Sequence, residues 1–329
     1  MRRFGILIAI FLIGVTTFWG LTSFVIYQYR RPGPLLVAKN IVIPKGNNKI
    51  VLERLQTEAV LSKGQFTTWL FQAAVYFTRS QGALHAAELT FPQHVSMQQA
   101  LSILRHAPPV QHEITIPEGL TAFQIEKIIN KAPFMQGQIN LNEEARILPQ
   151  TYKYEWGTSR QQILTRMENA MQKKLQVIWQ NRENNAEIKS PRDLMTLASI
   201  IEKETALANE RPKIARVFIN RLQLNMKLQS DPTVIFALTQ GKTALDRPLQ
   251  HADLNIASPY NTYWVKGLPA GPICSPGEAS LNAAAHPYNG DMLYFVANST
   301  GGHNFAKTLD EHNRNVAIYR QENQKNKKP

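Results

Sequence analysis

The feature that most constrains this chain is an apolar stretch near the start of the sequence, residues Phe4–Tyr27. It carries no charge over 24 residues, and a helix of that length can cross the hydrocarbon core of a bilayer. Trp19, Tyr27 and Tyr29 are typical of the aromatic belt at a membrane surface. A cleaved signal peptide is the alternative, but its apolar core would be shorter and a small-residue cleavage site should follow. The sequence therefore predicts an uncleaved transmembrane anchor.

The chain is strongly basic, with a formal net charge of +13. Such a surface suits an anionic polymer, an anionic membrane face or nucleic acid. No recognition helix, zinc finger or base-stacking motif is found, so no nucleic acid is predicted as a partner. Part of the charge lies in the C-terminal segment NQKNKKP, which is typical of a disordered tail. Basic residues flank the apolar stretch on both sides, so charge bias alone does not orient it.

Cysteine and histidine give little support for metal or nucleophilic chemistry. Cys274 is the only cysteine, which excludes an internal disulfide and a cysteine-based zinc site. It has no activating histidine beside it, so packing is favoured over a nucleophilic role. His286, His303 and His312 lack the close helical spacing of metal ligands. We therefore predict neither a metal nor a cofactor.

The first half of the chain alternates short β-branched runs with helical ones. A strand–turn–helix plan occurs twice, with its turns at Val42–Gly46 and Thr115–Gly119. Between them Ser96 and Gln99 are spaced as a capping box at the start of a helix. This pattern predicts an α+β region.

From Thr158 the chain becomes mainly helical, and after Leu254 it turns loop-rich before a strand at Met292–Ala297. Helices are expected to start at Ser159, Ser190, Pro212 and Ser230, from capping residues and first-turn prolines.

The helix that starts at Ser190 aims one acid at its own apolar side. At about 100° per residue, one arc holds Leu194, Leu197, Ile200, Ile201, Leu207 and Ala208. Glu204 lies inside this arc, whereas Glu202 falls more than a quarter turn outside it, towards water. The restart at Pro212 predicts that the helix ends at about Asn209.

Two interpretations of Glu204 stay open at this point. Buried acids are usually paired, so Glu204 could be structural and pair with Arg211, Arg216 or Arg221. Alternatively, burial could raise its pKa and keep it protonated near neutrality, as a general acid requires. Downstream, Tyr260, Asn261, Thr262 and Tyr263 mix aromatic, amide and hydroxyl groups as sugar sites do, although the same residues could form a simple turn.

A series of segments, in order, resembles the YceG-like family, the MltG-type endolytic murein transglycosylases. They are LASIIEKET, ARVFINRL, LQSDPTVIFAL, SPYNTY, GLPAGPI, SPG, LNAAAHP, LYFVA and GGHNFAKTLDEHN. The resemblance is dense from about Gln150 to Val316, and ITIPEG fits the same family. It implies an α+β fold with an N-terminal transmembrane helix, a small LysM-like α+β subdomain, and a mainly helical lysozyme-like catalytic domain with a loop-rich and β C-terminal part.

The resemblance and the patterns together give six expected segments. They are a cytoplasmic tail (1–3), a transmembrane anchor (4–27), a linker (28–39), a LysM-like α+β region (40–145), a catalytic transglycosylase domain (146–318) and a basic disordered tail (319–329). The family implies a single-pass protein of the cytoplasmic (inner) membrane, with its catalytic domain on the periplasmic or outer side. Its partners would be peptidoglycan glycan strands, the membrane and cell-wall synthases.

The family cleaves the bond between N-acetylmuramic acid and N-acetylglucosamine without water and leaves a 1,6-anhydro end. Lytic transglycosylases commonly place their glutamate before a serine or threonine, as in Glu204-Thr205, so the resemblance implies that Glu204 is the single general acid and base. Expected sugar-binding residues are Asn220, Gln229, Asp231, Thr233, Tyr260, Asn261, Thr262 and Tyr263.

Two other classes of function remain open. The chain could be a non-enzymatic, membrane-tethered glycan-binding module. It could also be a hydrolytic muramidase that uses a second carboxylate, for which Asp231 is the candidate.

Overall fold

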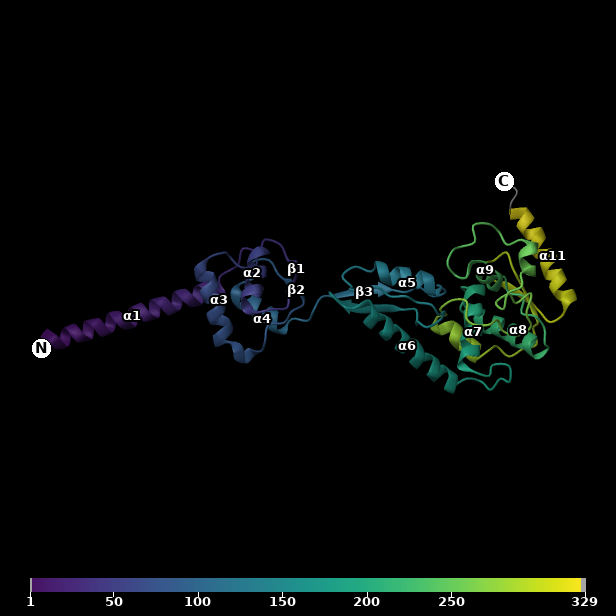
Figure 1. The fold of residues 1–329 in the computed structure, drawn as a ribbon, viewed down its shortest axis with the longest axis horizontal. Coiled ribbons are helices and arrows are strands. Elements are labelled where there is room, and N and C mark those ends of the chain that lie inside the picture. The colour runs from purple at the N-terminus through teal and green to yellow at the C-terminus, as the bar shows by residue number, and fades with distance from the viewer. Residues whose placement is uncertain (1, 327–329) are drawn as a thin grey trace. The chain divides into compact units, whose positions relative to one another are not determined.

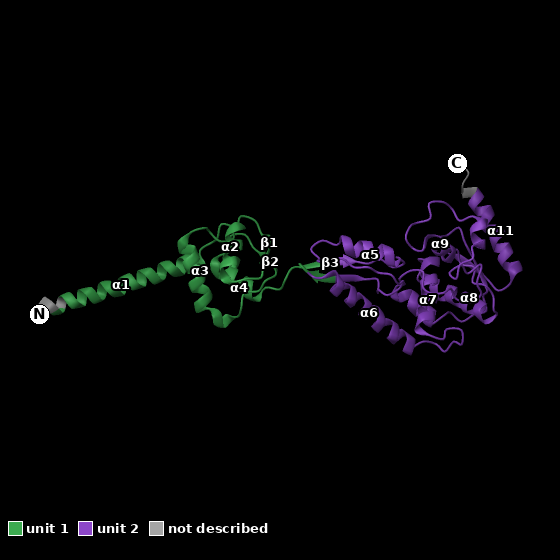
Figure 2. Ribbon diagram, viewed as in Figure 1, with its two compact units in different colours: residues 1–112, 153–157 green, residues 113–152, 158–329 purple. Residues whose placement is uncertain are grey.

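The computed structural model describes residues 2–326 (Figure 1). The chain forms two compact units, which Figure 2 colours separately. Unit 1 holds residues 1–112 and 153–157, and unit 2 holds residues 113–152 and 158–329. The mixture of helices and short strands confirms the α+β prediction at the level of fold class. The domain boundary predicted between residues 145 and 146 lies inside unit 2 and stays a prediction.

The apolar stretch near the N-terminus forms one long helix in unit 1, α1 (Arg2–Arg30). Its segment Ile6–Arg30 contains an 18-residue window with a mean hydropathy of 2.0, and none of this window is buried inside the protein. By length and composition this helix can cross a membrane. It continues past Tyr27 into the first residues of the predicted linker.

The rest of unit 1 packs three helices against a two-stranded sheet. In that sheet β1 (Lys39–Val42) pairs antiparallel with β2 (Glu88–Phe91). The helical elements are α2 (Asn48–Thr57), α3 (Gln65–Phe77), a 3-10 turn (Arg79–Gln81) and α4 (Met97–His106). Their apolar faces meet the sheet in one hydrophobic core. The capping box between Ser96 and Gln99 is present at the start of α4 and confirms the predicted start of this helix.

Unit 2 contains most of the helices. The division between the units passes through the paired strands β3 (Gln111–Thr115) and β4 (Thr151–Glu155). The further elements are α5 (Ala122–Lys131), α6 (Arg160–Gln180), α7 (Pro191–Glu204), α8 (Arg211–Gln223), α9 (Asp231–Thr239), a 3-10 turn (His251–Asn255), α10 (Glu278–Ala285), β5 (Tyr294–Ala297), β6 (His303–Ala306) and α11 (Leu309–Asn326). Strands β5 and β6 form an antiparallel hairpin.

Helix α7 lies at the centre of the unit 2 core. Ser190 caps it, because its side chain accepts a hydrogen bond from the backbone N–H of Asp193 (3.1 Å). Leu197 and Ile200 are fully buried and share one hydrophobic cluster with residues of α6, α8 and α10. The cluster fixes the helix firmly, so its last residue has a defined position. Cys274, also fully buried, has the packing role that the sequence favoured.

The predicted end of α7 is wrong. The helix ends at Glu204 rather than near Asn209, because Thr205 adopts an extended conformation (φ −146°, ψ 139°). The Thr205 hydroxyl accepts a hydrogen bond from the N–H of Leu207 (3.0 Å) and donates one to Glu210 Oε2 (3.3 Å). Such local side-chain bonds compete with helical ones. Leu207, predicted in the buried arc, is therefore 40% exposed.

The C-terminal segment also differs from the prediction. Helix α11 continues to Asn326, through residues 319–326 of the predicted disordered tail. Its start is stabilised by a reciprocal pair of bonds: the Glu311 N–H donates to Thr308 Oγ1 (3.2 Å), and the Lys307 N–H donates to Glu311 Oε2 (2.9 Å). Residues 327–329 lie outside the described residues.

Candidate active site

Glu204 stands at the point where α7 ends and α9 begins. Its side chain is half-buried, and Oε1 accepts a hydrogen bond of 2.5 Å from Ser230 Oγ. Ser230 immediately precedes α9. The carboxyl at the end of one helix is thus held by the residue just before another helix, 26 positions later in the chain.

Ser230 is itself rigidly placed. Its backbone N–H donates to Thr262 Oγ1 (2.9 Å), and its carbonyl accepts from Thr233 Oγ1 (2.6 Å). The hydroxyls of Thr233 and Thr262 lie 2.8 Å apart and share a further hydrogen bond. All three residues are buried. Because the surrounding hydroxyls fix the Ser230 backbone, the direction of its bond to Glu204 is fixed as well.

The environment raises the pKa of Glu204 from 4.5 to about 6. Burial is the main cause, because it disfavours the charged form. The hydrogen bond from Ser230 opposes this shift, and the negative charge of Asp231 adds to it. The carboxyl therefore exchanges its proton close to neutral pH, which suits a group that both donates and accepts a proton.

The alternative interpretation, in which Glu204 pairs with an arginine and is structural, does not agree with the structure. Within residues 2–326 Glu204 forms no ion pair. Arg211 pairs instead with Glu202 (3.4 Å). Arg216 donates to the carbonyl of Tyr288.

Glu202 is buried in a different way from Glu204. Its side chain is 6% exposed, it pairs with Arg211, and Oε2 accepts from the backbone N–H of Gly277 (3.0 Å). The expectation that it points towards water is wrong, because a segment far along the chain covers it. Both oxygens of Glu202 are engaged, so its role is structural.

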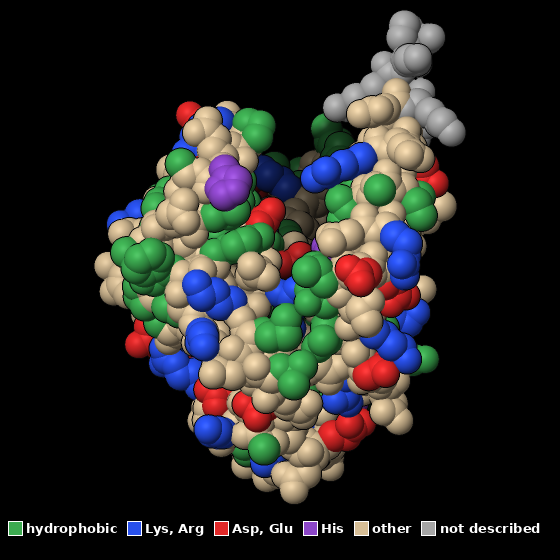
Figure 3. All heavy atoms as spheres, turned by 90° about the vertical axis from the view of Figure 1, so that its right-hand side faces the viewer, with side chains coloured by type: hydrophobic (Ala, Val, Ile, Leu, Met, Phe, Trp, Pro, Cys, Tyr) green, Lys and Arg blue, Asp and Glu red, His purple; other side chains and the backbone are tan. Residues whose placement is uncertain are grey.

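Glu204 lines a cavity of about 360 Å³ in unit 2. Figure 3 shows that this end of the molecule is hollowed, with acidic and basic side chains inside the hollow. The cavity mixes charged, amide and aromatic groups, as sugar-binding sites do. It is lined by Glu204, Arg221, Leu228, Gln229, Asp231, Tyr263, Phe295 and His312.

Three of the predicted sugar-binding residues line this cavity, namely Gln229, Asp231 and Tyr263. Tyr263 donates its hydroxyl hydrogen to Asp231 Oδ1 (2.7 Å), and burial together with this bond raises its pKa. Gln229 Oε1 accepts from Arg221 Nη1 (3.1 Å), which fixes the orientation of the amide.

Four other predicted residues are not among the residues that line the cavity. Thr233 and Thr262 hold Ser230, as described above. The buried Asn261 donates its amide to the carbonyls of Leu254 and Ile256. Asn220 donates to the carbonyls of Gly290 and Met292. These groups form hydrogen bonds within the protein, so the four residues support the segments to which they bond.

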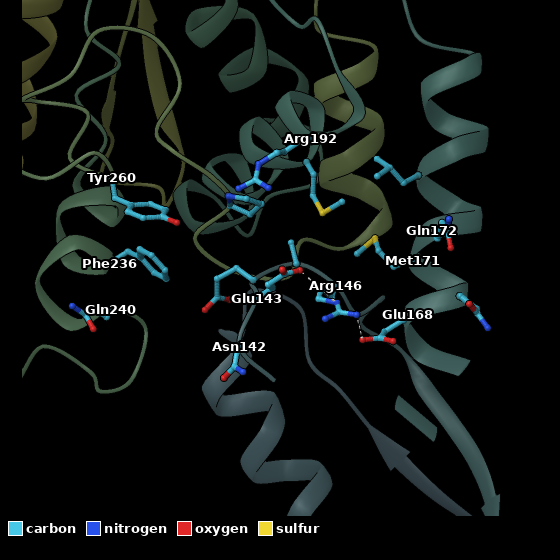
Figure 4. Close-up of a pocket in the computed structure, with 16 residues that line it drawn as sticks. Asn142, Glu143, Arg146, Glu168, Met171, Gln172, Arg192, Phe236, Gln240 and Tyr260 are labelled. Atoms are coloured by element: carbon cyan, nitrogen blue, oxygen red, sulfur yellow. Dashed lines mark ion pairs between the residues drawn. The ribbon is translucent and has the colours of Figure 1, made fainter. Parts of the chain in front are cut away.

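Tyr260, the remaining predicted residue, lines a second cavity of about 650 Å³ in the same unit. Figure 4 shows its ring beside Phe236, with the Arg146–Glu168 ion pair (2.8 Å) on the other side. The Tyr260 and Phe236 ring centres are 4.9 Å apart. Burial raises the pKa of Glu144 in this cavity to about 7, although a backbone hydrogen bond from Ala122 opposes the shift.

The sequence did not predict four of the lining residues, Arg221, Leu228, Phe295 and His312. Arg221 lies on α8, and its guanidinium donates to the carbonyls of Lys227, Leu228 and Leu293. His312 stacks on Tyr294, and its Nδ1 is buried without a hydrogen-bond partner in the described part of the chain. The HN pair of the DEHN segment was the only available signal for His312. Periodicity could not place α11 against the strands β5 and β6.

The fold and the site together define a protein with a half-buried carboxyl of raised pKa at the end of a core helix, where it lines a cavity. The chain belongs to the YceG-like family, whose sequence model matches residues 41–318. This confirms the family that the sequence motifs indicated.

Individual relatives agree with this membership. An endolytic murein transglycosylase of Bacillus subtilis is 51% identical over 121 residues, 37% of this chain. One of Streptococcus pneumoniae is 36% identical over 179 residues, 53% of this chain. Each match covers 32% of the relative, so the chain aligns with about a third of the length of these proteins.

A solved structure shows the same fold. The crystal structure of a YceG-like protein from Listeria monocytogenes has a TM-score of 0.51 and 28% sequence identity. The likeness covers 84% of this chain and 98% of that one.

Proposed function

We propose that this chain is a membrane-anchored lytic transglycosylase that cleaves peptidoglycan strands, with Glu204 as its single general acid and base. The observation that carries the proposal is the Glu204 carboxyl itself. It is held by Ser230, faces a cavity, and has a pKa of about 6. The names of the relatives supply the substrate class, since they are called endolytic murein transglycosylases.

The reaction needs one proton donor that later becomes a proton acceptor. Protonated Glu204 gives its proton to the glycosidic oxygen as the bond from muramic acid C1 to that oxygen breaks. The C6 hydroxyl of the same muramoyl residue then attacks C1, and the Glu204 carboxylate takes up the hydroxyl proton. No water is consumed, and the product carries a 1,6-anhydro ring. At a pKa of about 6, roughly half of the molecules hold the proton at pH 6.

The neighbouring residues fit supporting roles. Ser230 occupies one oxygen of Glu204, which leaves the other oxygen to face the glycan. Gln229, Asp231 and Tyr263 are proposed to contact sugar hydroxyls from the cavity wall. Asn220, Thr233, Asn261 and Thr262 would act on the sugar only through the segments to which they bond.

The second cavity extends the proposed binding surface. Asp231 of the first cavity and Phe236 of the second lie on α9, and Tyr263 and Tyr260 lie on one loop. A glycan strand laid along this helix would reach both cavities. Tyr260 would then stack on a sugar several rings away from the cleaved bond.

The hydrolytic alternative assigns a second catalytic role to Asp231. That carboxylate accepts the Tyr263 hydroxyl hydrogen, a bond better suited to holding a side chain than to activating water. A non-enzymatic glycan-binding module would have no use for a carboxyl with a raised pKa. Both points favour the transglycosylase.

The wider architecture follows the same proposal. Residues 4–27 would cross the cytoplasmic membrane once, with unit 2 on its outer side near nascent glycan strands. The LysM-like region at 40–145 and the lysozyme-like character of 146–318 are parts of this proposal, as are cell-wall synthases as partners.

The mass of the product tests the proposal. The full chain in detergent is incubated with purified glycan strands, and the new ends are analysed by mass spectrometry. We expect 1,6-anhydro-muramic ends, which are one water lighter than reducing ends. Reducing ends as the main product would show a hydrolase, and unchanged strands would favour a binding module.

A further inference from the structure

Helix α3 in unit 1 carries a continuous aromatic surface that the fold does not cover. Besides the exposed polar residues Gln65 and Gln72 of the same helix, this surface consists of Phe66, Trp69, Ala73, Tyr76 and Phe77. Their spacing of three, four, three and one residues places them on one face of the helix. Trp69 is 77% exposed and Phe77 79% exposed. The opposite face of α3 serves the core, where Phe71 is fully buried.

Exposure of such an apolar face to water is unfavourable. Four large aromatic side chains in a row exceed the scattered apolar residues of an ordinary surface, and patches of this kind mark sites of interaction. No charged residue occurs from residue 64 to residue 78. The first charges on either side are basic, Lys63 and Arg79. The Arg79 guanidinium lies 4.6 Å from the centre of the Tyr76 ring.

The position of α3 next to α1 indicates what covers this face. Phe66 at the start of α3 contacts Phe24 of α1, with ring centres 5.7 Å apart. Phe24 lies one turn before Tyr27, at the end of the apolar stretch where an aromatic belt is expected. In Figure 1, α3 runs across the direction of α1 rather than along it. A helix placed in this way beside a membrane span lies in the plane of the bilayer surface.

We propose that α3 is an interfacial membrane helix whose aromatic face inserts into the lipid headgroup region beside the α1 anchor. Aromatic residues suit this region because they combine an apolar body with polar or polarisable groups. Lys63 and Arg79 would meet anionic headgroups at the two ends of the helix. The contact would hold unit 1 against the membrane surface, which a single spanning helix alone does not do. The inference goes beyond glycan cleavage and rests only on the proposal that α1 spans the membrane.

Lipid quenching tests the inference on the full chain. Single cysteines are introduced at Ala73 and Phe77 on the aromatic face, at Thr16 within α1, and at Glu53 on α2, and each is labelled with an environment-sensitive fluorophore. The chains are reconstituted at a low protein-to-lipid ratio in vesicles of phosphatidylethanolamine and phosphatidylglycerol. Nitroxide lipids quench either near the headgroups or near the acyl-chain ends. The unmodified chain is the labelling blank, because Cys274 is buried.

An interfacial helix buries its apolar face about 5–10 Å into the headgroup boundary, so shallow nitroxides should quench labels at 73 and 77 at least about two-fold more than the label at 53. Ala73→Cys keeps every aromatic side chain, which guards against a loss of the helix through Phe77→Cys. Labels at 73 and 77 that behave like the label at 53 would overturn the inference. A blue-shifted emission without lipid quenching would also overturn it, because it would show contact with protein. The label at residue 16 tests the membrane anchor separately. If nitroxides near the acyl-chain ends do not quench this label, the proposal that α1 spans the membrane is wrong, and the inference about α3 loses its basis.

Discussion

Removal of the Ser230 hydroxyl should change the pH dependence of glycan cleavage in a defined direction. Ser230 Oγ donates to Glu204 Oε1, and this bond stabilises the charged carboxylate. In Ser230→Ala the carboxylate loses that stabilisation, so the pKa of Glu204 should rise. Glu204 must begin protonated to act as an acid, and it is active below its pKa. The alkaline limb of the kcat/KM profile should therefore move to higher pH.

The size of the shift follows from the bond. A hydrogen bond to a charged group contributes about 1.5–3 kcal/mol, and one pKa unit corresponds to about 1.4 kcal/mol. Water can replace part of the lost bond because Glu204 is only half-buried, so the lower end applies. We expect an increase of about one unit above the wild-type value of about 6. At pH 7 the protonated fraction should then rise about five-fold, from about a tenth to about a half.

The assay is the release of anhydro ends from purified glycan strands by the full chain. The rate is measured from about pH 5 to about pH 9, a range that includes the expected pKa values of both chains. Each profile is scaled to its own acid plateau, so that a general loss of rate does not affect the result. Ser280→Ala is the matched control, because Ser280 is a buried serine of α10 whose hydroxyl has no partner in the described residues. An alkaline limb that stays in place, or moves to lower pH, would refute the role of Ser230.

Further predictions concern the acids themselves. Glu204→Gln should abolish cleavage, whereas Glu202→Gln should keep substantial turnover. Glu202→Gln should lose about 1–3 kcal/mol of stability, because Arg211 loses its charged partner. If mass spectrometry of the products shows the reverse for the two variants, Glu204 is the wrong choice of acid. Glu204 has a folded pKa raised from 4.5 to about 6, so the wild type should lose up to about 2 kcal/mol of stability as the pH rises from about 4.5 through about 6, and Glu204→Gln should not. Denaturant unfolding measures the stability difference between the wild type and Glu204→Gln at about pH 4 and at about pH 7, on the two sides of this pH range. The same difference at both pH values would contradict the raised pKa. Asp231→Asn should weaken substrate binding yet leave residual turnover with anhydro ends, and complete loss of turnover would favour the two-carboxylate mechanism.

The sequence by itself determined the local features. The uncharged stretch Phe4–Tyr27 could only form a long exposed helix, because its length and composition leave no polar face. The capping boxes at Ser96 and Ser159 set two helix starts correctly, since a cap and its partner lie three residues apart. The apolar arc of α7 likewise placed Glu204 on the packed side of its helix. Each of these depends on neighbours in the chain.

Helical periodicity did not predict that Glu202 is buried, nor did it predict which groups surround the two acids. Glu202 lies outside the apolar arc, yet it is covered by Arg211 and the backbone of Gly277. The helix also stops at Glu204 because Thr205 bonds to Leu207 and Glu210 instead of continuing the turn. A helical wheel assumes one flat apolar surface, and here several segments surround the end of the helix.

Only the tertiary structure decided the composition of the site. It brings Ser230 to Glu204 and His312 to Arg221, and it uses Asn220 and Asn261 to hold loops rather than to line the cavity. These contacts join residues that are far apart in sequence, and they depend on how whole helices pack. The types of residue were legible in the sequence, but the direction in which each polar group points is fixed by the hydrogen-bond partners that packing provides.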